Sequence, residues 1–159
     1  MDPAAFKDAM SRWASGVAVV TTNHDGLLYG LTVSSLISVS LEPPLVLVSL
    51  HNESRLIAML EASGRFAVSL LGEDQEAASR YFSSPGREPT EGFVEIPGDW
   101  TELGQPFVAG ALAHVVCRRH RAIVAGDHTL VLGEVVHASA EAARSPLLYF
   151  HRGYRRLAD

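Results

Sequence analysis

Short apolar runs that alternate with tight turns dominate this chain and limit what it can fold into. The first two runs, residues 16–22 and 27–33, flank an Asp25-Gly26 pair, which is a strong signal for a two-residue hairpin turn. Runs of the same kind follow at 37–41, 45–50, 65–71, 111–118, 129–138 and 146–150. Roughly six to eight such strands with only minor helices predict a mainly β fold, a barrel or a sandwich, rather than alternating βα units.

Two neighbouring runs differ in how their side chains should be buried. The run "ISVSL" alternates, with Ile37, Val39 and Leu41 on one face and two serines on the other, which is typical of a strand with one apolar face. The next run, residues 45–50, is apolar on both faces and therefore predicts a strand buried on both. A Glu-Pro-Pro break separates the two strands.

Short amphipathic helices are predicted at three places, residues 3–13, 52–63 and 73–82. For the second of these we expect Asn52 to be the N-cap and Gly64 to follow the end. Residues 83–109 are rich in proline, glycine and acidic groups and predict a long irregular stretch. Loops of this length tend to be functional lids or interface arms.

Length and composition indicate one globular unit with a partner. At 159 residues the chain suits a single domain spanning 1–159. Its 47% hydrophobic content is high for this length, so we expect another subunit to cover part of the apolar surface. The formal net charge of −5 argues against nucleic acid as the main partner. Basic residues cluster only locally, at 117–121 and 151–156, as solvated faces and strand ends do.

The cysteine count and the apolar runs predict a soluble protein of the cytoplasm. Cys117 is the one cysteine, so no intrachain disulfide can form, which fits a reducing compartment. The opening "MDPAAFKDAM" has no basic segment followed by an apolar one, so we expect no signal peptide. No apolar run approaches the roughly 18 residues that a membrane span needs, so we expect no membrane partner.

Several common site motifs are missing from the sequence. It has no G-x-G-x-x-G after a strand, no G-K-[ST] phosphate loop and no G-x-S-x-G elbow. Its seven histidines show no metal-ligand spacing, and we expect no metal site. Cys117 precedes two arginines that could lower its thiol pKa, but a small residue packed in a strand is the favoured interpretation.

Hydroxyl side chains run through the apolar stretch at residues 29–54, and a buried hydroxyl without a partner costs about 1–3 kcal/mol. One interpretation is a binding site: small donors at strand ends, followed by the helix start "HNESR", where free N–H groups and the dipole attract phosphate. Together these features suit flavin mononucleotide. The other interpretation is that the hydroxyls satisfy turns, a bulge and a helix cap. Spacing alone slightly favours the second.

The stretch "GLTVSSLISVSLEPPLVLVSLHNES" resembles the signature of the flavin-reductase-like family, short-chain NAD(P)H:flavin oxidoreductases built on an FMN-binding split β-barrel. Its specificity comes from the combination of T-V-S-S, S-V-S-L, the E-P-P break and the following V-S-L. The similarity continues in order through "FKDAMSRWASGVAVVTT", "RFAVSLL", "SRYF", "GALAHVVCR", "GDHTLVLGEV" and "PLLYFHRGYRRL". It therefore covers nearly the whole chain.

The resemblance implies a flavin site in three parts. A first segment would run along the isoalloxazine and bond to its polar edge; it consists of Leu31, Thr32, Val33, Ser34 and Ser35. Ser34 stands where many members of the family carry asparagine, so the bond made there is expected to differ. Ser49 and Leu50 would lie beside the ring or the ribityl chain. The phosphate would be held by Ser54 and Arg55 and covered by Phe82 and Ser83.

The open face of the ring is where nicotinamide must stack, and there the resemblance places His128 and Tyr154. We assign His128 the catalytic role of steering the nicotinamide; an ordinary hydrogen-bonded turn residue is the equal alternative. The three arginines of the tail would meet the pyrophosphate of the nucleotide or form a solvated end; they are Arg152, Arg155 and Arg156.

The family implies a homodimeric split β-barrel that passes hydride from NADH or NADPH to FMN or FAD. The reduced flavin would serve a partner monooxygenase. Two alternatives stay open: a flavoenzyme with tightly bound FMN that reduces a small organic acceptor, and a non-catalytic flavin-binding module. The sequence does not choose between FMN and FAD, or between NADH and NADPH.

Overall fold

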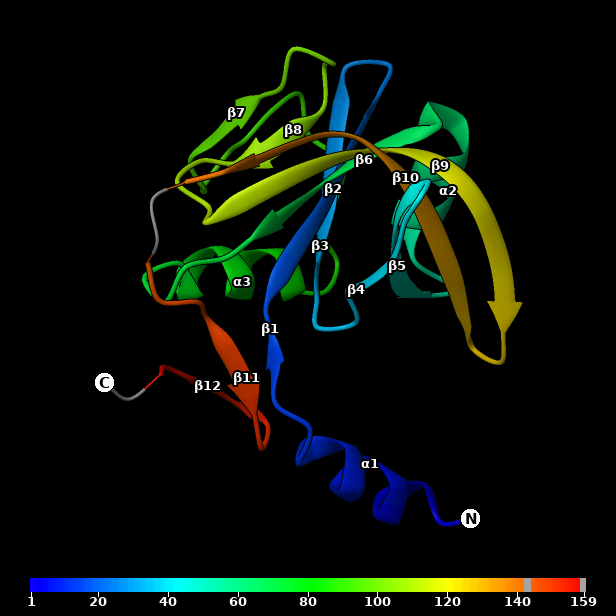
Figure 1. Cartoon of the computed structure of the whole chain (residues 1–159), viewed down its shortest axis with the longest axis vertical. Helices are drawn as coiled ribbons and strands as arrows, with labels where there is room; N and C mark the ends of the chain where they lie inside the picture. Colours follow the sequence, from blue (N-terminus) through cyan, green and yellow to red (C-terminus); the bar gives the residue numbers. More distant parts are fainter. Residues whose placement is uncertain (142–143, 158–159) are drawn as a thin grey trace.

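A seven-stranded antiparallel sheet with strand order β3-β2-β6-β9-β10-β5-β4 forms the body of the protein (Figure 1). The computed structural model describes residues 1–141 and 144–157. Within these residues the fold is mainly β with three short helices, α1 (Pro3–Ser11), α2 (Arg55–Ser63) and α3 (Glu76–Ser83). The sheet strands are β2 (Ala18–His24), β3 (Leu27–Val33), β4 (Ile37–Leu41), β5 (Pro44–His51), β6 (Arg65–Leu70), β9 (Ala113–Ala125) and β10 (His128–Ala140).

The Asp-Gly hairpin predicted from the sequence is confirmed as β2–β3. Its strands pair from Ala18 with Val33 to His24 with Leu27. Asp25 and Gly26 take φ values of 51° and 82°, which a mirror-image turn requires and which glycine tolerates best. Because β3 is an edge strand, this turn places the first part of the signature stretch at one edge of the sheet, while β4 and β5 continue the stretch at the other edge.

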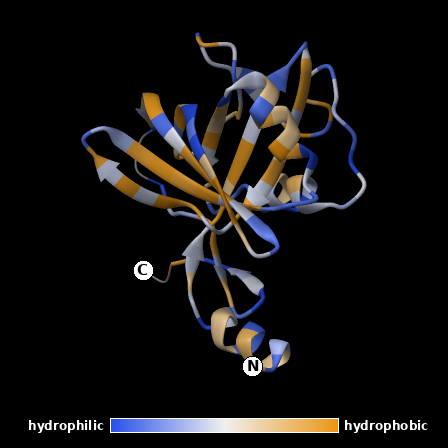
Figure 2. Cartoon of the chain, turned by 90° about the vertical axis from the view of Figure 1, so that its right-hand side faces the viewer, coloured by the Kyte–Doolittle hydropathy of each residue, from blue (hydrophilic) through white to orange (hydrophobic). Residues whose placement is uncertain are grey.

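Two apolar clusters pack against the sheet. The first lies under α2, where Leu56 and Leu60 are fully buried against residues of six strands, among them Phe66. The second lies on the other side, where Phe82 of α3 packs with residues such as Val19 and Leu147. Figure 2 shows the corresponding apolar bands along the strands. The sheet is therefore held between two helices.

The start of α2 differs from the sequence prediction. Ser54, not Asn52, is the N-cap, and its side chain accepts a bond of 3.2 Å from the Leu56 backbone N–H. Asn52 instead joins the strand end to the β9–β10 turn: its amide donates to the Gly126 carbonyl, and its oxygen accepts from the Thr129 hydroxyl. Because Asn52 forms these tertiary hydrogen bonds, its side chain does not cap the helix. The predicted end is confirmed, since Gly64 caps α2 in the left-handed conformation.

Strands extend beyond the residues that the sequence patterns predicted. Strand β9 runs through the basic cluster 117–121 to Ala125, because a long antiparallel pairing with β10 supports it. The stretch 83–109 is not wholly irregular, since it contains a small hairpin of β7 (Gly98–Trp100) and β8 (Pro106–Val108). A third small sheet joins β1 (Ser15–Gly16), β11 (Leu148–Phe150) and β12 (Gly153–Arg155).

The apolar face of β4 is on the surface of this chain. The strand itself was predicted correctly, yet Ile37, Val39 and Leu41 are 56%, 47% and 85% exposed. Strand β5 is also less covered than predicted: Val48 and Leu50 are buried, but residues 45–47 are only half-buried. A row of exposed apolar side chains therefore lines the second edge of the sheet.

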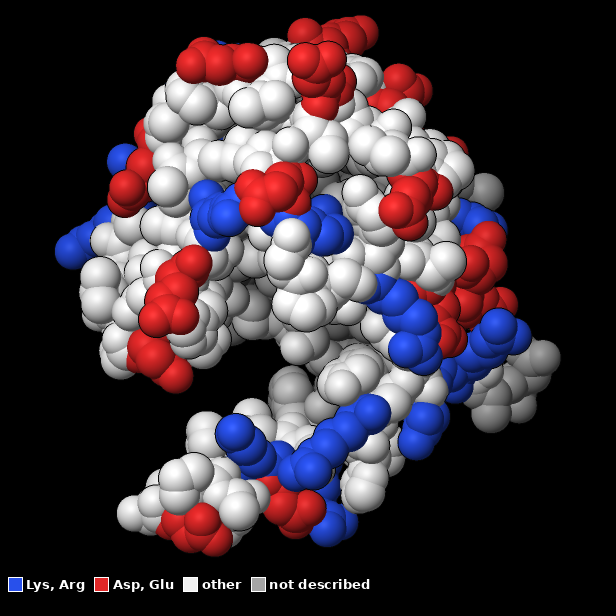
Figure 3. All heavy atoms as spheres, turned by 180° about the vertical axis from the view of Figure 1, so that it is seen from behind, with Lys and Arg blue, Asp and Glu red and all other residues white. Residues whose placement is uncertain are grey.

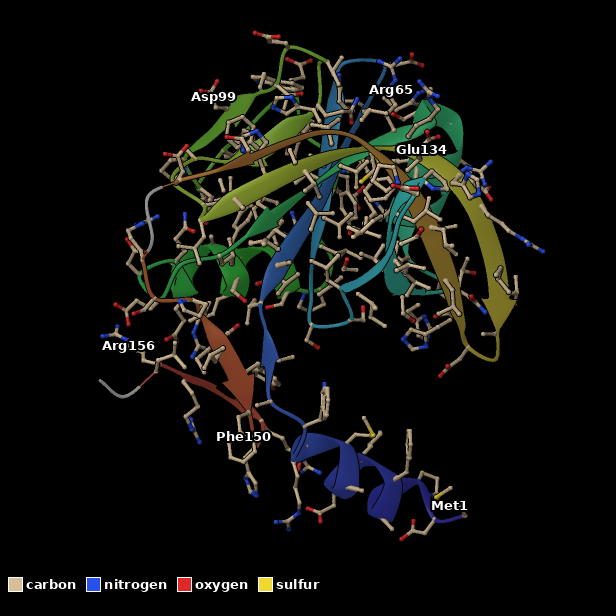
Figure 4. The ribbon with its side chains drawn as sticks, viewed as in Figure 1. Met1, Arg65, Asp99, Glu134, Phe150 and Arg156 are labelled. Atoms are coloured by element: carbon tan, nitrogen blue, oxygen red, sulfur yellow. The ribbon has the colours of Figure 1, made fainter. Side chains whose placement is uncertain are left out.

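Helix α1 projects from the body as an arm (Figures 1 and 4), and none of its residues is buried. Asp2 caps it by accepting from the Ala4 N–H at 2.9 Å. Its far end is fastened to the β11–β12 turn by a backbone bond of 2.7 Å from the His151 N–H to the Ser11 carbonyl. In the part of the chain that the structure describes, no helix has the length and apolar character to cross a membrane.

We predict that Gly133→Ala destabilises the fold by about 1–3 kcal/mol, the usual cost of overpacking. An added Cβ would lie 2.4 Å from the Phe66 ring and 2.7 Å from the Cβ of Cys117. Denaturant-induced unfolding measures the change. Gly16→Ala is the control, because nothing lies within 4 Å of its Cβ position. Equal stability of the two variants would contradict this account of the core.

Candidate functional site

Two cavities lie beside the edge strand β3. The first has a volume of about 280 Å³, and its lining consists of Tyr29, Leu31, His51, Glu53, Ser54, Arg55, Gly86 and Arg87. The second has a volume of about 220 Å³, and its lining consists of Val17, Thr32, Val33, Ser34, Ser79, Ser83, Tyr149 and Tyr154. The structure thus distributes most of the sequence-predicted site residues over two neighbouring cavities.

The first cavity is cationic and lies at the start of α2. Arg55 is the first residue of the helix, and the Ser54 side chain is already used as its cap. The Arg55 guanidinium forms an ion pair with the carboxylate of Glu88, which comes from the loop after α3. Helix N-termini and guanidinium groups both favour phosphate, so this end of the site suits an anionic group.

Arg87 is a functional candidate that the sequence patterns did not reveal. Its guanidinium donates to the backbone carbonyl oxygens of Gly30 and Phe82 and lies 5.2 Å from the centre of the Tyr29 ring. Its buried Nε has no hydrogen-bond partner among the described residues. Arg87 lies within the stretch predicted to be irregular, where no periodicity or motif marks a single arginine.

The second cavity is bordered by a chain of hydroxyl contacts. The Thr32 hydroxyl donates to the backbone carbonyl of Ser79 at 2.7 Å, and the Ser79 hydroxyl lies 2.8 Å from the Tyr154 hydroxyl. The guanidinium of Arg80 lies 5.0 Å from the centre of the Tyr154 ring. These contacts fasten β3 and the C-terminal hairpin to α3, and they fix the position of Tyr154.

Several predicted hydroxyls have partners within the chain. Ser35 donates to the carbonyl of Ser49 at 3.0 Å and accepts from its N–H at 3.2 Å. Ser83 donates to the carbonyl of Arg80 at 3.0 Å. Ser34 is exposed and lines both the second cavity and a larger groove. The side-chain oxygens of four predicted residues therefore bond to backbone groups, as the second interpretation expects: Thr32, Ser35, Ser54 and Ser83. The exposed Ser34 has no such bond within the described residues.

The structure does not bring every predicted residue to a cavity. The side chain of Phe82 is fully buried, with its ring 5.0 Å from that of Tyr81, so it lies in the core rather than over a phosphate. Leu50 is 2% exposed and packs in the other core cluster. Ser49 meets Ser35 through its backbone. The resemblance placed Phe82 over the phosphate and Leu50 beside the ring or the ribityl chain, whereas in this structure both side chains pack in the core.

His128 and Tyr154 lie on different sides of the chain. His128 opens β10, and its Nδ1 lies 2.7 Å from the Asp127 carboxylate. The hydrogen bond from His128 is the main cause that lowers the pKa of Asp127 below its usual value. The His128 ring meets that of His51 edge-on at 5.3 Å, which places it beside the first cavity. The β9–β10 turn and β12 are on opposite sides of Figure 1, so one chain does not bring His128 to Tyr154.

A groove of about 990 Å³ separates the α1 arm from the body, and Figure 3 shows this hollow from behind. Its lining is mostly apolar and includes Trp13, Ser34, Ser35, Ile37 and Tyr149. Acidic and basic side chains intermix on the surface around it (Figure 3). The groove adjoins the second cavity, because Ser34 and Tyr149 line both.

Cys117 belongs to the core. Burial raises the pKa of its thiol to about 12, so the neighbouring arginines do not activate it. Over residues 1–141 and 144–157, no group of three histidine, cysteine or acidic side chains is placed to hold a metal ion.

Comparison with known proteins gives a consistent result. Residues 10–158 match the family described as "Flavin reductase like domain". The chain is 43% identical to the reductase component of 4-hydroxyphenylacetate 3-monooxygenase from Thermus thermophilus, over 96% of this chain and 95% of that protein. It is 38% identical to an NADH:riboflavin 5'-phosphate oxidoreductase from Streptomyces pristinaespiralis, over 96% and 86%. A solved structure of the Streptomyces globisporus NADH:FAD oxidoreductase with NAD and FAD fragments superposes with a TM-score of 0.92, at 36% identity, over 99% and 93%.

Proposed function

This chain belongs to the family of flavin reductase like domains, and from that membership we propose that it is an NAD(P)H:flavin oxidoreductase that supplies reduced flavin to a partner monooxygenase. The observation that carries the proposal is the cationic cavity beside β3, in a chain that matches flavin reductases over its full length. We propose FMN or FAD as the flavin and NADH or NADPH as the donor; relatives are named for both flavins and for NADH.

The side chains present suit a flavin nucleotide. The first cavity offers the guanidinium groups of Arg55 and Arg87 beside a helix start, and the buried Arg87 Nε has no hydrogen-bond partner within residues 1–141 and 144–157. This donor set matches a phosphate ester. Strand β3 lies between this cavity and the second one, so Leu31, Thr32 and Ser34 would follow the ring system. Ser35 and Ser49 would support that segment through their mutual bonds.

The reaction needs position more than acid–base groups from the protein. The two bound nucleotides supply the hydride chemistry themselves. The protein's contribution is to orient both rings and to exclude water, and small errors in such positioning cost rate steeply. Tyr154, fixed by Ser79 and Arg80, would border the ring, and His128, fixed by Asp127, would orient the nicotinamide.

We further propose a single-domain, homodimeric split β-barrel in the cytoplasm. The exposed apolar row on β4 supports the dimer, as do Val124 at the tip of the β9–β10 hairpin and Trp13 after α1, which are 74% and 73% exposed. A second subunit that covers these side chains would stabilise the dimer by about 25 cal/mol for each Å² of apolar surface that it buries. Such a partner could also unite the His128 end of one subunit with the Tyr154 end of the other.

Steady-state oxidation of NADH with and without added FMN tests the enzymatic function. We expect a rate that rises with free flavin and saturates, because flavin acts as a substrate. A rate that ignores added flavin but requires an organic acceptor would favour a flavoenzyme with bound FMN. An absence of NADH and NADPH oxidation with any flavin would leave only a binding module.

Light scattering tests the dimer, with an expected mass of twice the 17.1 kDa of one chain. Leu41→Asp should shift the mass to that of the monomer, because it places a charge in the proposed interface. Val94→Asp is the matched control, since Val94 is 68% exposed in the loop before β7. A wild-type mass of 17.1 kDa would refute the dimer.

His128→Ala should lower kcat/KM for the nicotinamide donor by about five- to tenfold, the worth of one hydrogen bond. The dissociation constant for FMN should stay nearly unchanged, because the residue is assigned to the nicotinamide. His120→Ala, an exposed histidine on β9, is the control. Kinetics equal to the wild type would assign His128 to the turn alone.

A further inference from the structure

The cationic cavity contains a feature that opposes its proposed use. Arg55, which is assigned to the flavin phosphate, is already paired with the carboxylate of Glu88. An anion that binds Arg55 must therefore separate this pair or share its guanidinium with a second negative charge. Glu88 directly follows Arg87, so the loop that supplies one cation of the cavity also supplies the anion that neutralises the other.

The pair has little to contribute to folding. The side chains of Arg55 and Glu88 are 53% and 67% exposed, and exposed pairs are typically worth about 0–1 kcal/mol. No other ion pair of either residue is present among the described residues. The geometry thus gives Arg55 a weak, replaceable partner, which suits a group that is exchanged during a reaction cycle.

The two arginines of the cavity differ in whether a carboxylate is paired with the guanidinium. Arg87 is held by the carbonyl oxygens of Gly30 and Phe82 and lies near the rings of Tyr29 and Tyr81. Its charge is therefore fixed in place and has no carboxylate partner within residues 1–141 and 144–157. Arg55 is half-exposed on the surface and does have one. One cation is permanently available, and the availability of the other depends on Glu88.

The backbone around Glu88 favours rotation of the side chain over movement of the loop. Pro89 follows Glu88 and restricts its backbone to extended conformations, and Pro85 lies three residues before it. The carboxylate can therefore leave Arg55 by rotation of its own side chain while Arg87 stays in position.

We propose that Glu88 is an internal competitor for the flavin phosphate: its carboxylate occupies Arg55 when the flavin is absent and returns as the flavin leaves. This inference rests on the proposed function and concerns the same cavity. The consequence is a flavin that binds less tightly than two free arginines would hold it. A reductase that must release reduced flavin to a second protein requires such a lowered affinity for the flavin.

Equilibrium binding of FMN and riboflavin to Glu88→Gln tests the proposal. The amide keeps the shape of the side chain but releases Arg55, so the dissociation constant for FMN should fall by about three- to fivefold, the upper range for an exposed pair. Riboflavin has no phosphate, and its dissociation constant should not change. Glu91→Gln, an exposed acid of the same loop, removes the same charge and controls for a general electrostatic effect.

A double-mutant cycle completes the test. In an Arg55→Ala background, Glu88→Gln should leave the FMN dissociation constant unchanged, because the competition acts only through Arg55. The proposal is overturned if Glu88→Gln weakens FMN binding, if riboflavin gains equally, or if Glu91→Gln has the same effect. The proposed function fails separately, if the wild type neither binds FMN nor oxidises NADH.

Discussion

One serine hydroxyl holds together the part of the structure on which the site depends. Strands β3 and β4 are the two edges of the seven-stranded sheet, yet they follow each other in the chain. Ser35, in the link between them, bonds to both backbone groups of Ser49 on β5. A buried backbone group left without a partner costs about 1–3 kcal/mol, so this double contact stabilises the curvature that brings the edges near each other. The two cavities lie along β3, on the strand that leads into this link.

Apolar surfaces of β4 and α1 stay exposed in one chain, and a second subunit could cover them. The apolar side chains of β4 stay exposed in the part of the chain that the structure describes. The α1 arm, with no buried residue, is in the same situation. In the proposed dimer both surfaces would be covered, and two ends of the site that lie apart in one chain would meet. Fold stability and completion of the site would then depend on the same contact.

Short sequence windows were enough to predict most helices, strands and turns. They could not predict the contacts between residues that lie far apart in the chain. The Asp25-Gly26 turn and the Gly64 cap each require a particular backbone conformation, which a short sequence window reveals. The sequence predicted Asn52 as the cap of α2, but the structure has Ser54 there. The reason is that the β9–β10 turn, more than seventy residues away in the chain, supplies partners for Asn52. Arg87 and Glu88 stand in a stretch without periodicity, so only the fold reveals that Arg87 contacts Gly30 and that Glu88 contacts Arg55. Phe82, which the resemblance placed over the phosphate, has its side chain packed in the core, and that packing follows from contacts between distant elements.

The bond between His151 and Ser11 makes the two distant ends of the described chain a single mechanical unit. The short β1–β11 pairing and the backbone bond from Val17 to Leu147 fasten the base of the arm to the same C-terminal segment. Cleavage within the C-terminal hairpin would therefore also release the N-terminal helix, and the groove between arm and body would lose one wall. Sensitivity to proteases at one end of this protein is in effect a property of the other end as well.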